Sequence, residues 1–218
     1  MKQDYSFYIA LGYISFLSII IPLLTGFIKK KNFSREYNLI FFLILVSLIC
    51  ETTIYILFKQ KINNLFISRI QGISELILLS LFFSRVFSTS KMNILIKTFI
   101  FVFFGVAAID LYLNGFNSLD NISLTTECIL LMIYSLLAFF HLIKNPVYEN
   151  ILAAPLFWFN TAILMYFSGN LFLFVFSNYV ESHYSKTLPA LWGIHSLLNI
   201  AFYFLISVGF WKTETKQI

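Results

Sequence analysis

The sequence has few charged residues, few prolines and glycines, and two cysteines. Charged side chains make up 11% of the 218 residues and hydrophobic ones 59%, whereas a soluble globular domain has about a quarter of its residues charged. A chain this apolar has too little polar surface to cover itself in water, which excludes an ordinary soluble domain. Cys50 and Cys128 both fall within apolar runs, so we expect two small buried hydrophobic residues rather than a disulfide framework.

What the sequence has instead is a series of long apolar runs. A helix needs about 20 mainly apolar residues to cross a hydrocarbon layer about 30 Å thick. Seven runs meet this requirement, at residues 6–28, 38–58, 64–87, 92–113, 119–143, 152–178 and 188–211. We therefore predict an all-α fold in which residues 1–218 form a single seven-helix transmembrane domain. The connections between these runs are short, so we expect no soluble domain, and any ligand site should lie within the bundle or its mouth.

The distribution of Lys and Arg predicts the orientation, because cytoplasmic loops carry an excess of positive charge. One set of helix ends carries ten basic residues: Lys29, Lys30, Lys31, Arg35, Arg85, Lys91, Lys97, Lys144, Lys212 and Lys216. The opposite set carries five: Lys2, Lys59, Lys61, Arg69 and Lys186. We predict a multi-pass protein of the cytoplasmic (inner) membrane with its N-terminus outside and its C-terminus inside. The basic residues then mark the cytoplasmic side, where they lie next to the anionic lipids of the bilayer. The net charge of +5 is therefore poor evidence for nucleic-acid binding.

Three glutamates fall inside the predicted helices, where an ionisable side chain costs about 2.5–3.5 kcal/mol to insert and faces the bundle interior. They are Glu51, Glu75 and Glu127. Each has polar neighbours at helical spacing, for example Gln71 four residues before Glu75, so each helix presents a polar stripe. We predict that these stripes converge in one cavity that opens toward the outer face.

The last two predicted helices carry further polar side chains. Trp192, His195, Asn199 and Tyr203 follow one another at intervals of three, four and four residues, which places them on one helix face. The preceding helix contains Asn170, within a Ser-Gly-Asn step that favours close helix approach or a local break. Uncharged hydrogen bonding between helices explains a single Asn or Ser, but such bonding rarely needs carboxylates.

The candidate ligand-binding residues are therefore the following: Glu51, Glu75, Glu127, Trp192, His195, Asn199, Tyr203, Arg69 and Asn170. Arg69 and His195 are the two basic groups deep enough to pair with the three acids, which leaves spare negative charge. A proton, a metal ion or a cationic ligand would neutralise this charge. For a metal, the candidate ligands are Glu51, Glu75, Glu127 and His195.

Three patterns resemble a known group of proteins. They are Pro-Leu-Phe-Trp-Phe at residues 155–159, Tyr-Phe-Ser-Gly-Asn at 166–170 and Trp-Gly-Ile-His-Ser-Leu-Leu-Asn at 192–199. Together with the helix count and orientation, they resemble the small seven-helix sensor modules found in, or encoded beside, bacterial histidine kinases. This resemblance implies a sensor in signal transduction that relays to a separate cytoplasmic protein; it assigns no site residue.

Two alternatives stay open at this point. A small transporter or channel would use the intramembrane carboxylates to pass a proton or cation, and a homodimer would supply a path that one chain lacks. An intramembrane metal-dependent enzyme would need a ligand set rich in histidine, but His195 is the one deep histidine and no His-Glu-x-x-His motif occurs. The sequence thus favours a protein without enzymatic activity.

Overall fold

The computed structural model describes residues 2–116, 121–146, 148–184 and 187–214, and these residues form helices and short connections. The long helices are α1 (Lys2–Ser18), α2 (Ile20–Lys29), α3 (Arg35–Lys59), α4 (Leu65–Phe87), α5 (Ser90–Asn114), α6 (Asn121–Lys144), α7 (Pro155–His183) and α8 (Leu188–Trp211). Three single turns of 3₁₀ helix accompany them: η1 (Lys30–Asn32), η2 (Ile151–Ala153) and η4 (Lys212–Glu214).

Within the described residues, seven helical segments are long and apolar enough to cross a membrane. The shortest has 22 residues and the longest 27, which at about 1.5 Å per residue spans a hydrocarbon layer of about 30 Å. Large apolar side chains such as Phe101 and Phe172 point outward and are 80% and 68% exposed, as expected where lipid is the solvent. The chain is therefore a multi-pass membrane protein, and the predicted seven spans are confirmed.

The first span is built from two helices, α1 and α2, that meet at Ile19. Pro22 explains this interruption, because its ring has no N–H to donate and clashes with the carbonyl oxygen four residues earlier, that of Ser18. At the starts of two other helices proline is well tolerated. Pro155 and Pro189 occupy the first turns of α7 and α8.

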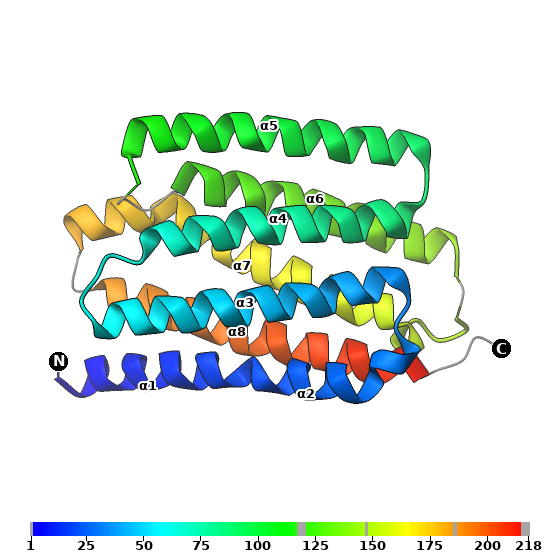
Figure 1. Cartoon of the computed structure of the whole chain (residues 1–218), viewed down its shortest axis with the longest axis horizontal. Coiled ribbons are helices and arrows are strands. Elements are labelled where there is room, and N and C mark those ends of the chain that lie inside the picture. The colour runs from blue at the N-terminus through cyan, green and yellow to red at the C-terminus, as the bar shows by residue number, and fades with distance from the viewer. Residues whose placement is uncertain (1, 117–120, 147, 185–186, 215–218) are drawn as a thin grey trace.

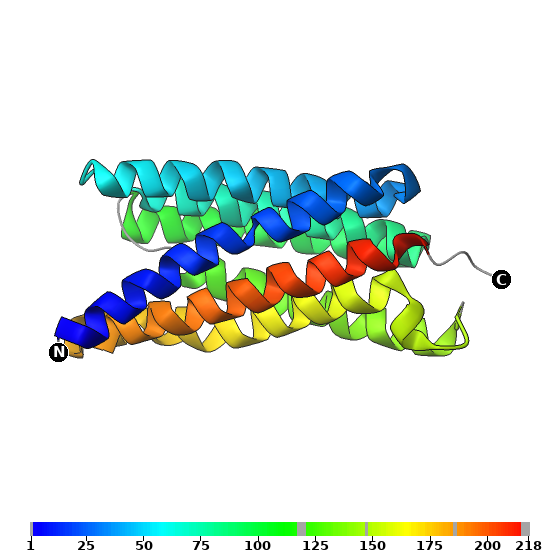
Figure 2. The ribbon, with the colours of Figure 1, turned by 90° about the horizontal axis from the view of Figure 1, so that it is seen from below.

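The helices lie side by side, and the chain begins and ends at opposite ends of the bundle (Figure 1). Helices α1 and α2 pack on α8, α8 packs on α7, and α7 packs on α6. Helix α6 also contacts α4 and α5, and α4 contacts α3, which returns to α2. Seen from below, α1 and α2 cross the gap between α3 and α8 (Figure 2). Helix α5 lies at the edge of the bundle (Figure 1).

We call the end that carries Lys30, Lys31, Arg35, Arg85 and Lys144 the lysine-rich end, and the end where α1 begins the N-terminal end. Near the lysine-rich end the interior is filled by aromatic rings. The members of this phenylalanine core are Phe33, Phe41, Phe82, Phe83, Phe87, Phe159 and Phe210.

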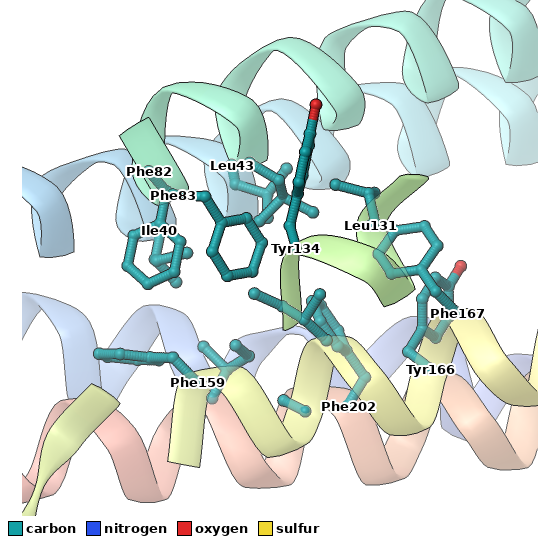
Figure 3. Packing of buried hydrophobic residues seen from close by; sticks show 14 of the residues in the cluster. Ile40, Leu43, Phe82, Phe83, Leu131, Tyr134, Phe159, Tyr166, Phe167 and Phe202 are labelled. Atoms are coloured by element: carbon teal, nitrogen blue, oxygen red, sulfur yellow. The ribbon is translucent and has the colours of Figure 1, made fainter. Parts of the chain in front are cut away.

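Ring contacts connect the phenylalanine core across the four helices α3, α4, α7 and α8. The centroids of Phe82 and Phe83 lie 5.1 Å apart, and those of Phe159 and Phe210 lie 5.2 Å apart. Phe82, Phe83 and Phe159 converge from α4 and α7, with Ile40 of α3 beside them (Figure 3). Tyr134 of α6 extends the cluster toward mid-membrane and lies 5.7 Å from Phe83.

The Ser-Gly-Asn step in α7 serves close packing and does not break the helix, which is continuous through it. A Cβ atom added at Gly169 would lie 2.7 Å from the Leu198 side chain of α8. The absence of a side chain at Gly169 therefore lets α7 and α8 approach closely, which is one of the two outcomes expected from the sequence.

Candidate functional site

A hydrogen bond between Glu51 and Tyr203 joins two helices across the interior. The Tyr203 hydroxyl of α8 donates to Glu51 Oε1 of α3, and Tyr203 is almost completely buried. Among the described residues α3 packs closely on α2 and α4 rather than on α8. The Tyr203–Glu51 hydrogen bond therefore connects α3 and α8 through their side chains, while each of the two helices packs on other helices.

Glu75 lies beside this bridge, on α4. Its Oε1 accepts a hydrogen bond of 2.8 Å from Gln71 Nε2 one turn earlier, so the predicted polar stripe on this helix is present. Glu51 and Glu75 are also close enough to interact electrostatically. Two carboxyl groups from neighbouring helices thus share one interior region with a tyrosine hydroxyl.

A small closed cavity lies between α3, α4, α7 and α8 at this point. Its volume is about 10 Å³, which is about the space that one water molecule needs. Its polar lining comes from Ser47, Glu75, Tyr166, Asn199 and Tyr203. A cavity of this size can hold one water molecule, through which the Glu75 carboxyl group could exchange a proton. It has no room for an organic ligand.

His195 makes a separate polar contact nearer the N-terminal end. Its Nδ1 lies 2.7 Å from Asn170 Oδ1, while Asn170 Nδ2 donates to the Tyr166 carbonyl oxygen at 2.9 Å. Because an amide oxygen can only accept, His195 Nδ1 must carry the proton. The ring centroids of Tyr166, Trp192 and Phe174 lie 6.0, 5.7 and 6.3 Å from the imidazole. The aromatic surroundings and the Asn170 contact hold α7 and α8 together.

Glu127 and Arg69 line a different pocket, of about 360 Å³, between α4, α5 and α6. Both side chains are buried, with Glu127 2% exposed. A Cβ atom at Gly72 would lie 3.0 Å from Glu127 Oε2, so this glycine makes room for the carboxylate. Arg69 Nη2 donates to the Gly115 carbonyl oxygen at 2.8 Å, which ties α4 to the end of α5.

The structure brings together some of the residues expected in one outward-facing cavity and separates others. Glu75, Asn199 and Tyr203 line the small closed cavity and Glu51 bonds to Tyr203, whereas Glu127 and Arg69 line the pocket beside α5. Trp192 lines a third, very small pocket with apolar neighbours. The physical reason is that helical spacing predicts which residues share a face, but not which helix that face meets.

The four residues expected to hold a metal lie in three different places: Glu51 and Glu75 near Tyr203, Glu127 in the pocket beside α5, and His195 next to Asn170. Searched over the described residues, the chain contains no group of three or more His, Cys, Asp or Glu side chains that could hold a metal ion. Glu51, Glu75, Glu127 and His195 thus do not form a common ligand set in this arrangement.

One buried acid, Asp110 of α5, was missed by the sequence analysis. It is completely buried and accepts hydrogen bonds from Ser123 N at 2.8 Å, Ser123 Oγ at 2.8 Å and Asn114 Nδ2 at 2.6 Å. Ser123 lies in the first turn of α6, where backbone N–H groups lack helical partners and negative charge is favoured. Asp110 therefore caps α6 from the neighbouring helix. The available signal was an Asp four residues before Asn114 in an otherwise apolar run.

Comparison of the chain with protein-family models, with curated proteins and with solved structures finds no match. The resemblance to bacterial sensor modules consequently rests on the three sequence patterns, the helix count and the predicted orientation. A functional interpretation therefore rests on the geometry of the site.

Proposed function

We propose that this chain is a sensor-like membrane protein in which Glu51, Glu75 and Tyr203 form a proton-responsive site. The observation that carries the proposal is the Tyr203–Glu51 hydrogen bond across the interior, next to a closed cavity that Glu75 also lines. In an environment of low dielectric constant, adding or removing one charge beside a second carboxylate changes the local energy strongly. The bond between α3 and α8 then depends on the number of protons that the two acids hold.

Helix α8 offers a path from this site to the lysine-rich end. Tyr203 lies two turns before Phe210, and Phe210 stacks on Phe33 with ring centroids 4.8 Å apart. At the end of the same helix, the Trp211 ring accepts a cation–π contact from Lys29 Nζ at 4.2 Å. A shift of α8 relative to α3 would therefore change side-chain packing at the surface near the lysine-rich end.

The relay partner in this proposal is a separate cytoplasmic protein. In the proposed orientation the N-terminus lies outside, and the lysine-rich end faces the cytoplasm of a bacterial cell, following the excess of Lys and Arg at that end. The connections described between the helices are short, so the bundle itself passes the signal by side-chain packing at that surface.

A transporter of protons or cations is the second candidate, because Glu51 and Glu75 lie close together deep in the membrane. The two functions differ in one measurable property. A transporter passes a net flux of protons or cations across liposomes that contain the purified protein, whereas a sensor changes conformation without flux.

Infrared difference spectroscopy between acidic and neutral pH tests the proposal directly. We expect carboxyl C=O stretching bands that change with pH in the wild type, and that are altered in both the Glu51→Gln and Glu75→Gln variants. Glu149→Gln, which changes an exposed acid outside the long helices, is the matched control. It should leave the bands that Glu51 and Glu75 contribute unchanged. Identical difference bands in the wild type and in both core variants would contradict the proposal.

A further inference from the structure

A large pocket lies at the lysine-rich end and is separate from the proton-responsive site. Its volume is about 560 Å³, within the range of about 300–1,000 Å³ that is typical of small-molecule sites. The last turns of α4 and α6, the first turns of α3 and α7, and described residues between α6 and α7 such as Pro146 and Tyr148 form its walls. Its charged, imidazole and phenol groups are those of Glu36, Tyr37, Arg85, His141, Tyr148 and Glu149, and Ser88 and Asn145 add further polar atoms.

The wall between α6 and α7 is held in place by its own hydrogen bonds. Leu152 N donates to Asn150 Oδ1 at 2.9 Å, and Trp158 Nε1 donates to the Leu152 carbonyl oxygen at 2.8 Å. On the opposite wall, the His141 ring lies 6.0 Å from the Phe87 ring. These contacts between the chain's own residues define the shape of the pocket walls.

The charges that line the pocket are of both signs. Among the described residues neither Glu36 nor Glu149 makes a hydrogen bond or an ion pair. Arg85 Nη1 donates to the Arg35 carbonyl oxygen at 3.1 Å, which leaves further guanidinium N–H groups for an anion. The pocket thus offers two carboxylates to a cationic group and a guanidinium, with a neighbouring imidazole, to an anionic one.

The pocket also lies at the ends of spanning helices, where a hydrocarbon layer about 30 Å thick gives way to headgroups. Its lining includes Val86, Leu142 and Ile143, and Ile143 is 69% exposed and directly precedes Lys144. A lysine at the end of a spanning helix extends its ammonium group into the membrane interface. A ligand here can place a polar group among the charges and an apolar group along α6.

From these features we propose that the pocket binds a zwitterionic phosphate ester with a primary ammonium group, the chemistry of a phosphatidylethanolamine headgroup. The phosphate contacts Arg85 and His141 through charge-assisted hydrogen bonds, and the ammonium donates to Glu36 and Glu149. Tyr37 and Tyr148 add aromatic rings to the lining of the same pocket, which favours a cation. This assignment does not depend on the proposed proton-responsive site.

Lipid-dependent thermal stability in detergent tests the assignment. The purified full chain is titrated with phosphatidylethanolamine, phosphatidylcholine or phosphatidylglycerol that carry the same acyl chains, and apparent Kd values are derived from the shift in Tm. We expect phosphatidylethanolamine to bind about tenfold more tightly than phosphatidylcholine, because a quaternary ammonium cannot donate the charge-assisted hydrogen bonds. Equal binding of these two lipids, or tightest binding of phosphatidylcholine or phosphatidylglycerol, would overturn the assignment.

Variants locate the binding within the pocket. The double variant Glu36→Gln with Glu149→Gln should lose the preference for the primary ammonium, and Arg85→Gln should weaken binding of both zwitterionic lipids. Lys91→Gln, which removes an exposed charge at the same end but outside the pocket, should change neither. If the double variant does not fold, Glu149→Gln alone should reduce the preference, since Glu149 is exposed. An unchanged preference in a folded carboxylate variant would exclude the proposed site.

A soluble probe identifies the source of the ligand. O-phosphoethanolamine carries the same primary ammonium and a phosphate, as a monoester, without glycerol or acyl chains. A rise in Tm with this compound would show that the headgroup suffices and that a free metabolite can occupy the pocket. A rise with phosphatidylethanolamine alone would show that the apolar contacts along α6 are required and that the ligand is a membrane lipid. Absence of both effects would contradict the assignment.

Discussion

The half of the bundle near the lysine-rich end and the half near the N-terminal end are held together by different kinds of contact. In the first, rings from several helices interlock, for example Phe82 on Phe159 and Phe159 on Phe210. In the second, side chains such as Glu51 with Tyr203 and His195 with Asn170 join helices through hydrogen bonds. Ring packing is insensitive to protons, whereas a hydrogen bond to a carboxyl group is not. A response to pH should therefore begin in the polar half and reach the lysine-rich end only through α8.

The largest effect of a single substitution is expected in the phenylalanine core. Phe159→Ala removes a completely buried ring that contacts Tyr37, Phe82 and Phe210, and truncation of a buried Phe costs about 3–5 kcal/mol. The measurement is the free energy of unfolding in detergent micelles. Phe101→Ala, which removes an outward-facing ring, is the control and should cost far less. Equal losses for the two variants would show that the ring packing does not stabilise this half.

The next largest effect is expected at Asp110. Asp110→Ala leaves Ser123 N, Ser123 Oγ and Asn114 Nδ2 without their acceptor, which should lower the free energy of unfolding by about 2 kcal/mol. Asp110→Asn keeps one acceptor oxygen and removes the charge, so it should cost less than the alanine variant. The same unfolding measurement compares both variants. An alanine variant as stable as the wild type would contradict the capping role.

A smaller effect is expected for the pair Glu51 and Tyr203. A double-mutant cycle with Glu51→Gln and Tyr203→Phe should give a coupling energy of about 1 kcal/mol, because the two side chains contact each other. The coupling should decrease on acidification, since a hydroxyl binds an ionised carboxylate more strongly than a protonated one. Additive effects at every pH would show that the bond contributes nothing to the link between α3 and α8.

The smallest effect is expected at the edge of the polar half, at Lys59. Its Nζ donates to the Tyr13 hydroxyl at 3.2 Å on the exposed surface, and surface substitutions of this kind change stability by no more than about 0.5 kcal/mol. Lys59→Ala should therefore unfold at nearly the same denaturant concentration as the wild type. A loss comparable to that of Asp110→Ala would mean that surface contacts, rather than buried ones, hold α1 to α3.

The fold was largely predictable from the sequence because a helix that crosses the lipid bilayer needs a long apolar run, which is visible in the sequence. Each span needs an apolar run of sufficient length, and this constraint located all seven spans within the described residues. The interruption at Ile19 was not predicted, although Pro22 is its cause. The cytoplasmic side was predicted from Lys and Arg, and it stays a prediction.

The candidate site was only partly predictable, because its geometry depends on helix neighbours. The polar stripe of Gln71 and Glu75 follows from their spacing along one helix. The pairing of Glu51 with Tyr203 depends on how α8 faces α3, and the separation of Glu127 depends on α4 lying against both α3 and α6. A single sequence carries no direct signal for such packing.

Hydrogen–deuterium exchange between acidic and neutral pH, corrected for the intrinsic pH dependence of exchange, tests the central claim most directly. With the protein in lipid nanodiscs, protection should change in segments that contain Glu51 of α3 and Tyr203 of α8. It should stay constant in segments that contain Phe83 of α4 and Phe159 of α7. The change should disappear in Glu51→Gln. Uniform change along all helices, or a change that persists in this variant, would contradict a proton-responsive site at Glu51.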